Sequence, residues 1–156
     1  MATETVILKE GDEAPDFSAV ASGGMKMSLS DFKGKNVILY FYPKDDTPGC
    51  TKEACGFRDS FGQIKKRGAL VLGVSKDTAK SHDKFAEKFD LPFPLLSDED
   101  HKIAEAYGVW GEKKFMGRTY TGTHRVTFLI GGDRRIKKIW RDVKPDVHAE
   151  EVLAAL

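Results

Sequence analysis

The chain has 156 residues, of which 40% are hydrophobic and 31% charged, and this predicts one globular domain over residues 1–156 with a full hydrophobic core. Its 25 basic and 24 acidic residues are intermingled and leave a formal net charge of +1, so neither nucleic acid nor an acidic membrane is expected as a partner. No apolar run approaches the ~20 residues of a membrane span, and the N-terminus lacks the basic and apolar regions of a signal peptide. We therefore expect a cytoplasmic protein, with a monomer as the expected assembly.

The first part of the chain leads to a buried strand. Residues 6–8 are apolar enough for a short edge strand, and residues 14–17 have the pattern of an extended segment. Leu29 and Phe32 predict a turn. Residues 36–42 end in VILYFY, a run of β-branched, aliphatic and aromatic residues without polar alternation. This pattern is typical of a strand that is buried on both faces.

A helix follows this strand and carries both cysteines of the chain. Apolar residues recur with helical spacing at Phe57, Phe61 and Ile64. Gly68 stands where the helix would end. Because the helix begins after Pro48 and Gly49, Cys50 is expected in or near its first turn, and Cys55 follows on the same helix.

The start of a helix favours the reactive form of a thiol. Unpaired backbone N–H groups and the helix dipole stabilise a thiolate, which is the nucleophilic form. Lowering a thiol pKa by roughly two to three units needs about 3–4 kcal/mol, whereas a helix end typically supplies about 0.3–1 kcal/mol. The fold should therefore place a cation near Cys50.

The rest of the chain alternates strands and helices. Residues 70–75 form a second buried run, and the strand, helix, strand order with a long crossover makes it parallel to residues 36–42. The other expected elements are helices at 78–89, 98–107 and 145–156, a short extended segment at 95–97, and strand-like runs at 125–130 and 135–141 joined by a Gly-Gly-Asp turn. Together they predict a thioredoxin-like α/β fold, with a central mixed sheet flanked by helices.

Two cysteines so close together do not make a secreted disulfide framework, and in a reducing compartment such a pair is more often catalytic. Metal binding is the alternative. The Cys-x4-Cys spacing is wider than that of common zinc sites, however. The four histidines also show no ligand spacing that would complete a site: His82, His101, His124 and His148. We expect no metal, haem or flavin.

The sequence around the cysteines resembles a known family. Pro43, Thr47 and Cys50 match the P-x-x-x-T-x-x-C signature of peroxiredoxins. The longer string YFYPKDDTPGCTKEAC is similar to the PrxQ group, which is also known as the bacterioferritin comigratory protein group. The resemblance continues in four further segments and so covers nearly the whole chain: 11–17, 28–32, 107–110 and 125–130.

The resemblance implies a thiol peroxidase that reduces hydrogen peroxide and alkyl (organic) hydroperoxides. Cys50 is then the peroxidatic nucleophile and becomes a sulfenic acid. Cys55 resolves this acid as an intramolecular disulfide, and thioredoxin or a similar dithiol protein reduces the disulfide. Thr47 would hydrogen-bond the thiolate and the peroxide, unless it only caps the helix. Pro43 would keep water from the thiolate, although a proline that ends a strand is common.

Topology indicates Arg125 as the cation near Cys50. Ligands gather beyond the carboxyl ends of parallel strands, and a strand antiparallel to them begins at that same end. Arg125 is the first residue of the run 125–130, and it matches the arginine that peroxiredoxins place against the thiolate and the peroxide. Arg118, in an expected loop, is the alternative, and Arg58 lies too far along the cysteine helix.

Helix geometry limits how Cys50 and Cys55 can join. At this spacing on one helix, their Cα atoms would be ~8.7 Å apart and face about 140° away from each other, beyond the ~7 Å limit for a disulfide. The first turns must therefore unwind. Gly49 and Gly56 flank the pair and weaken the helix there, which favours local opening; the alternative is that Gly56 only allows close packing.

Two other classes of function remain open. A thiol-disulfide oxidoreductase on the same fold would normally carry Cys-x-x-Cys, which is absent from the sequence. A non-catalytic redox sensor or interaction module would oxidise Cys50 no faster than an ordinary thiol. The rate at which hydrogen peroxide oxidises the reduced protein separates these three classes.

Overall fold

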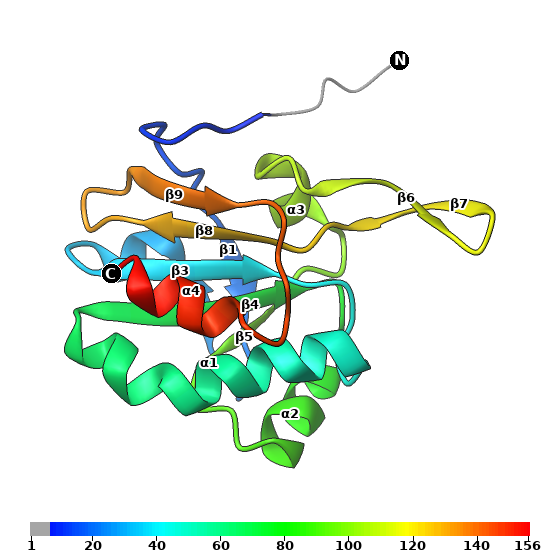
Figure 1. Ribbon diagram of the computed structural model, residues 1–156, viewed down its shortest axis with the longest axis horizontal. Coiled ribbons are helices and arrows are strands. Elements are labelled where there is room, and N and C mark those ends of the chain that lie inside the picture. Colours follow the sequence, from blue (N-terminus) through cyan, green and yellow to red (C-terminus); the bar gives the residue numbers. More distant parts are fainter. Residues whose placement is uncertain (1–6) are drawn as a thin grey trace.

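The computed structural model describes residues 7–156 as a central sheet with other elements packed on both of its faces (Figure 1). The sheet has five strands in the order β5-β4-β3-β8-β9. These strands are β3 (Asn36–Phe41), β4 (Ala69–Ser75), β5 (Leu95–Ser97), β8 (Val126–Ile130) and β9 (Ile136–Trp140). β3, β4 and β5 are parallel, whereas β8 is antiparallel to both β3 and β9. The expected mixed sheet is confirmed.

β3 is the central strand and separates two hydrophobic cores. Three helices share a core with one face of the sheet (Figure 1): α1 (Pro48–Lys66), α2 (Ala79–Lys88) and α4 (His148–Ala154). Successive side chains of a strand point to opposite faces, so Ile38 and Tyr40 belong to this core while Val37 and Leu39 belong to the other. Within residues 7–156, no helix is long and apolar enough to cross a membrane.

α1 is the long helix expected after the buried strand. Its buried side chains recur with helical spacing and comprise Cys50, Glu53, Ala54, Phe57 and Ile64. The helix ends before Gly68, which has a φ of +79°. Glycine adopts this left-handed conformation without the steric cost that a Cβ would bring. The predicted helix stop is therefore confirmed.

The N-terminal segment differs from the expectation. Of the expected edge strand at 6–8, residue 6 lies outside the described residues and the other two form no strand. A hairpin of β1 (Ser18–Val20) and β2 (Lys26–Ser28) was not expected. Both strands have three residues, which is too short to show a clear two-residue alternation. The predicted turn before the buried strand is a 3-10 helix, η1 (Leu29–Phe32).

α3 (Lys102–Ala106) is shorter than the helix expected at 98–107. The carboxylate of Asp98 accepts hydrogen bonds from the backbone N–H groups of Ile103 and Ala104, each at 2.9 Å. A side chain therefore satisfies the first helical donors, and the residues between Asp98 and the helix need not be helical themselves.

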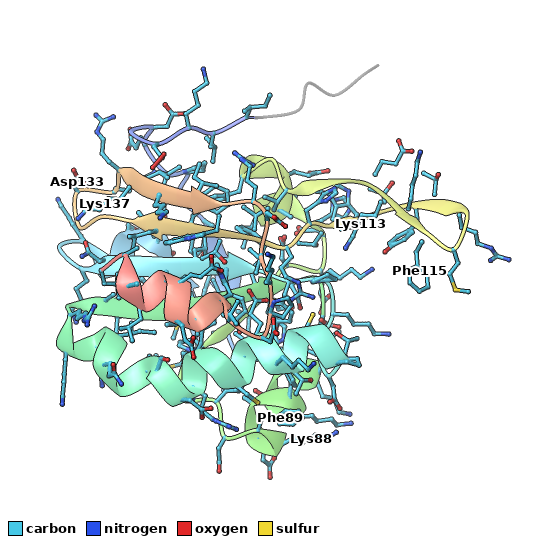
Figure 2. All side chains as sticks on the ribbon, viewed as in Figure 1. Lys88, Phe89, Lys113, Phe115, Asp133 and Lys137 are labelled. Atoms are coloured by element: carbon cyan, nitrogen blue, oxygen red, sulfur yellow. The ribbon has the colours of Figure 1, made fainter. Side chains whose placement is uncertain are left out.

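A second hairpin was missed between α3 and β8. It consists of β6 (Trp110–Phe115) and β7 (Arg118–Thr123) and projects away from the central sheet (Figure 1). Arg118 therefore begins a strand rather than lying in a loop. Phe115 is 66% exposed and lies on the projecting part of the hairpin (Figure 2). Because the hairpin buries little apolar surface, its sequence lacks the alternation of apolar and polar residues by which a strand with one buried face is recognised.

Candidate active site

Cys50 lies in the first turn of α1, just beyond the carboxyl end of β3. α1 begins at Pro48, with Thr47 as its N-cap residue, and the fixed φ of proline suits the first helical position. Cys50 is 1% exposed and carries a free thiol. A Cβ at Gly49 would lie 3.2 Å from Nη2 of Arg125. The glycine therefore permits a guanidinium to approach this turn closely.

Arg125 supplies a positive charge next to Cys50. It directly precedes β8, and the antiparallel register pairs Val126 with Phe41 at the carboxyl end of β3. Nη2 of Arg125 donates a hydrogen bond to Sγ of Cys50 at 3.3 Å. A full charge at this distance interacts with a thiolate by on the order of 5 kcal/mol at an effective dielectric constant of about 20, before desolvation is counted. This exceeds what the helix end alone supplies.

Glu53 shares this arginine with Cys50. It lies one turn further along α1, is fully buried, and its Oε1 accepts a hydrogen bond from Nη1 of Arg125 at 2.6 Å. Burial raises the pKa of Glu53 to about 7, although Arg125 acts in the opposite direction. One guanidinium therefore donates hydrogen bonds to two acidic groups. When Glu53 is protonated, more of the positive charge of Arg125 is available to stabilise the thiolate.

The sequence interpretation missed two charged residues near Cys50. Glu53 could have been found, because it is a charged residue on the otherwise apolar face of α1. Lys113 could not, because it belongs to the unexpected hairpin. Its Nζ donates to the carbonyl of Thr123 at 3.0 Å. Burial lowers the pKa of Lys113, and the charge of Arg125 lowers it further.

Glu53→Gln is expected to remove a pH dependence of folding stability. The pKa of Glu53 is higher in the folded chain, about 7, than the ordinary value of 4.5. The folded state therefore binds this proton more tightly, and the stability it contributes below pH 4.5 is lost as the pH rises to about 7. The free energy of unfolding that this proton contributes falls by about 3 kcal/mol over this pH range. Urea unfolding of both proteins at pH 4.5 and pH 7 measures it, and parallel pH profiles would contradict the assignment.

Thr47 and Pro43 lie in the turn before α1, and both are half-buried. Oγ1 of Thr47 donates to the carbonyl of Lys44 at 2.9 Å, and its side chain makes no capping hydrogen bond to α1. Among residues 7–156, the structure shows no hydrogen bond between this hydroxyl and Cys50. The expected hydrogen bond from Thr47 to the thiolate and the alternative helix cap are therefore both missing from the described residues. Pro43 follows the buried strand and ends it, since it lacks an N–H to continue the ladder.

Cys55 lies on the same continuous helix as Cys50, half-buried and with a free thiol. While α1 is intact, helix geometry keeps the two Cα atoms ~8.7 Å apart, so a disulfide requires unwinding. A Cβ at Gly56 would lie 3.2 Å from Cβ of Ala149 in α4. The structure therefore favours close packing as the reason for Gly56, and Gly56→Ala would change packing as well as helix stability.

The two other arginines considered for the site lie elsewhere. Arg118 is exposed at the start of β7. Nη1 of Arg58 donates to the carbonyl of Phe89 at 2.8 Å, and its Nε donates to Asp59 at 3.0 Å. Within residues 7–156, Arg125 is the arginine that the structure brings into hydrogen-bond contact with Cys50.

A buried thiol at a helix start, contacted by an arginine at the edge of a mixed α/β sheet, defines a thiol-based redox enzyme. The chain belongs to the AhpC/TSA family, whose profile matches residues 10–139. It is 52% identical to a putative peroxiredoxin Bcp of Coxiella burnetii over 149 residues, which cover 96% of this chain and 99% of that protein. It is 51% identical to peroxiredoxin Bcp of Escherichia coli K12 over 146 residues, which cover 94% of each chain.

Solved structures of related proteins have the same fold. A mutant of PrxQ from Xylella fastidiosa has a TM-score of 0.90 at 41% identity, covering 95% of this chain and 94% of that one. The bacterioferritin comigratory protein of Xanthomonas campestris, solved in connection with its alkyl peroxide reduction activity, has a TM-score of 0.85 at 41% identity, covering 89% and 88%. The thioredoxin-like fold and the resemblance to the PrxQ group are confirmed. The protein is a thiol-dependent peroxidase.

Proposed function

We propose that the thiolate of Cys50 attacks the O–O bond of hydrogen peroxide or an alkyl hydroperoxide. The sulfur bonds to one oxygen and becomes a sulfenic acid, while the other oxygen takes up a proton and leaves as water or an alcohol. The observation that carries the proposal is the 3.3 Å hydrogen bond from Arg125 to Sγ of Cys50. The same guanidinium can stabilise the oxygen that gains negative charge as the O–O bond breaks. The activity of the Xanthomonas campestris relative supports alkyl hydroperoxides as substrates.

Thr47, Pro43 and Glu53 complete the proposed site. The hydroxyl of Thr47 can rotate away from the Lys44 carbonyl and donate to a bound peroxide, because rotation about one bond redirects its proton. Pro43, which follows the end of β3, is assigned the role of limiting the access of water to the thiolate. Glu53 holds the guanidinium of Arg125 in a fixed orientation through its 2.6 Å hydrogen bond.

Cys55 is the proposed resolving cysteine. After the first turns of α1 unwind, its thiol attacks the sulfenic sulfur of Cys50, the S–S bond forms and water leaves. A thioredoxin-type dithiol protein then reduces the disulfide by thiol–disulfide exchange. We place the reaction in the cytoplasm, where such reductants keep thiols reduced, and assign it to residues 1–156 acting as one domain.

Stopped-flow mixing of the reduced protein with hydrogen peroxide tests this function. We expect oxidation about 10²–10³-fold faster than that of a free thiol, which is the factor that one preorganised donor commonly supplies. Cys50→Ser should abolish the fast reaction. A rate equal to that of an ordinary thiol would instead indicate a redox sensor or interaction module. Rapid exchange with thioredoxin without peroxide reactivity would indicate a thiol-disulfide oxidoreductase.

A further inference from the structure

A buried polar cluster holds the loop between β3 and α1. Asp45, in this loop, is 7% exposed, and its carboxylate accepts hydrogen bonds from the hydroxyls of Tyr42 at 2.6 Å and Ser81 at 2.8 Å. His82 of α2 is fully buried, and its Nδ1 lies 2.7 Å from Oδ2 of Asp45. The backbone N–H of Asp45 donates to the carboxylate of Asp77 at 2.8 Å. The loop is therefore tied to both α2 and the end of β4.

The contact between His82 and Asp45 has the geometry of an ion pair. Nε2 of His82 lies 2.9 Å from the carbonyl oxygen of Leu96, and Nδ1 faces the Asp45 carboxylate. Both partners offer acceptor oxygens, so a doubly protonated His82 ring would donate to both. Asp77 adds a carboxylate to this cluster. One possible metal-ligand atom from each of Asp45, Asp77 and His82 lies within 4.8 Å of the others. Because both nitrogens of His82 are already engaged, this cluster is a structural ion pair rather than an open metal site.

The part of α1 that must unwind lies between this ion pair and a second anchor. Phe57 is fully buried, and its ring centroid lies 4.8 Å from that of Tyr40. The next residue, Arg58, is hydrogen-bonded to the carbonyl of Phe89 beyond the end of α2. Both cysteines lie between Asp45 and Phe57. Unwinding increases the length of the unwound part from 1.5 Å per residue to at most ~3.3 Å per residue. The extra length is accommodated more easily if the loop at Asp45 also moves.

We propose that the His82–Asp45 ion pair sets how often the first turns of α1 open, and thereby how oxidised Cys50 divides between two products. This inference rests on the proposed function, in which Cys55 resolves the sulfenic acid. One product is the Cys50–Cys55 disulfide, formed with loss of water. The other is the sulfinic acid, formed when a second peroxide transfers oxygen to the sulfenic acid and leaves as water or an alcohol. His82 is a positioning residue that acts through Asp45 and contacts no substrate.

The ion pair favours the closed helix, so weakening it should favour the disulfide. In His82→Gln one amide replaces two oppositely directed N–H donors, and removing one partner of a buried charge pair is strongly destabilising locally. We expect disulfide formation about tenfold faster than in wild type and sulfinic acid per turnover about tenfold lower. The first oxidation step should stay within about threefold. Stopped-flow kinetics and mass spectrometry of the peroxide-treated proteins measure these three quantities.

Two variants serve as matched controls. Lys88, at the end of α2 (Figure 2), pairs with the neighbouring loop residue Asp46 at 2.8 Å, but both side chains are about half exposed. An exposed pair contributes little, so Lys88→Ala should change disulfide formation by less than about twofold. Lys52 is exposed between the two cysteines, and Lys52→Gly weakens the helix directly. It should speed disulfide formation about threefold and thereby show that the assay responds to opening.

Hydrogen exchange of the backbone amides of residues 49–56 in the reduced proteins measures opening without any use of Cys55. We expect exchange about tenfold faster in His82→Gln and unchanged exchange in β3. If His82→Gln does not fold, Ser81→Ala removes one donor to the same carboxylate and should shift both measurements in the same direction. Exchange and disulfide rates equal to those of Lys88→Ala would overturn the inference. A faster exchange in a protein that never forms the Cys50–Cys55 disulfide would support the role of the ion pair while rejecting Cys55 as the resolving residue.

Discussion

Replacing Arg125 with methionine is expected to slow the oxidation of Cys50 by hydrogen peroxide about 10²–10³-fold. Methionine fills much of the same space but carries no charge. The variant loses the donor 3.3 Å from Sγ, so a smaller fraction of the thiol is ionised at neutral pH. It also loses the donor that would stabilise the leaving oxygen. Thiolate absorbance across a range of pH measures the first loss, and stopped-flow kinetics at a pH of full ionisation isolates the second.

Arg118→Met is the matched control. Arg118 is exposed on the projecting hairpin, so this variant should oxidise at a rate within about twofold of wild type. Arg125→Met also leaves Glu53 buried without its partner, which could distort the site. Adding Glu53→Gln replaces this unpartnered carboxyl group with a neutral amide, so a rate that stays low in the double variant assigns the loss to Arg125 itself. Equal losses in the two arginine variants would reject Arg125 as the cation that activates Cys50.

The meeting of Cys50 and Arg125 could be predicted because it follows from backbone topology. Residues 36–42 have the composition of a buried strand, and the run that follows them has helical spacing. The parallel pairing of β3 with β4 and the antiparallel pairing with β8 then place a helix start and a strand start at the same edge of the sheet. Each of these steps depends on residue patterns within one segment.

The rest of the site depends on contacts between segments that share no local pattern. Asp45, Asp77 and His82 show no common spacing along the chain. They meet because their segments all lie at the carboxyl ends of parallel strands. The hairpin that carries Lys113 was missed for a related reason, since it packs mostly against itself. Glu53 is different, because its place on the apolar face of α1 was readable from the sequence.

Cys55→Ser is expected to abolish the intramolecular disulfide while leaving the first oxidation of Cys50 within about twofold of wild type. The chain has two cysteines, so no other thiol of the same molecule can attack the sulfenic acid. Cys55 is half-buried one and a half turns beyond Cys50 and is not bonded to it. Serine is nearly isosteric and should leave α1 intact. Mass spectrometry after one equivalent of hydrogen peroxide should show sulfenic acid in place of the disulfide.

Turnover with thioredoxin should fall at least about tenfold in this variant, because the sulfenic acid lies on a residue that is 1% exposed and a protein thiol cannot reach it while α1 is closed. Excess peroxide should then convert Cys50 to sulfinic acid, in proportion to the peroxide concentration. Cys55→Ala is the control for packing, since it removes the hydroxyl that serine introduces, and both variants should behave alike. Undiminished turnover would show that a thiol of the reductant or of a second chain resolves Cys50. The opening of α1 would then expose Cys50 to that partner rather than join it to Cys55.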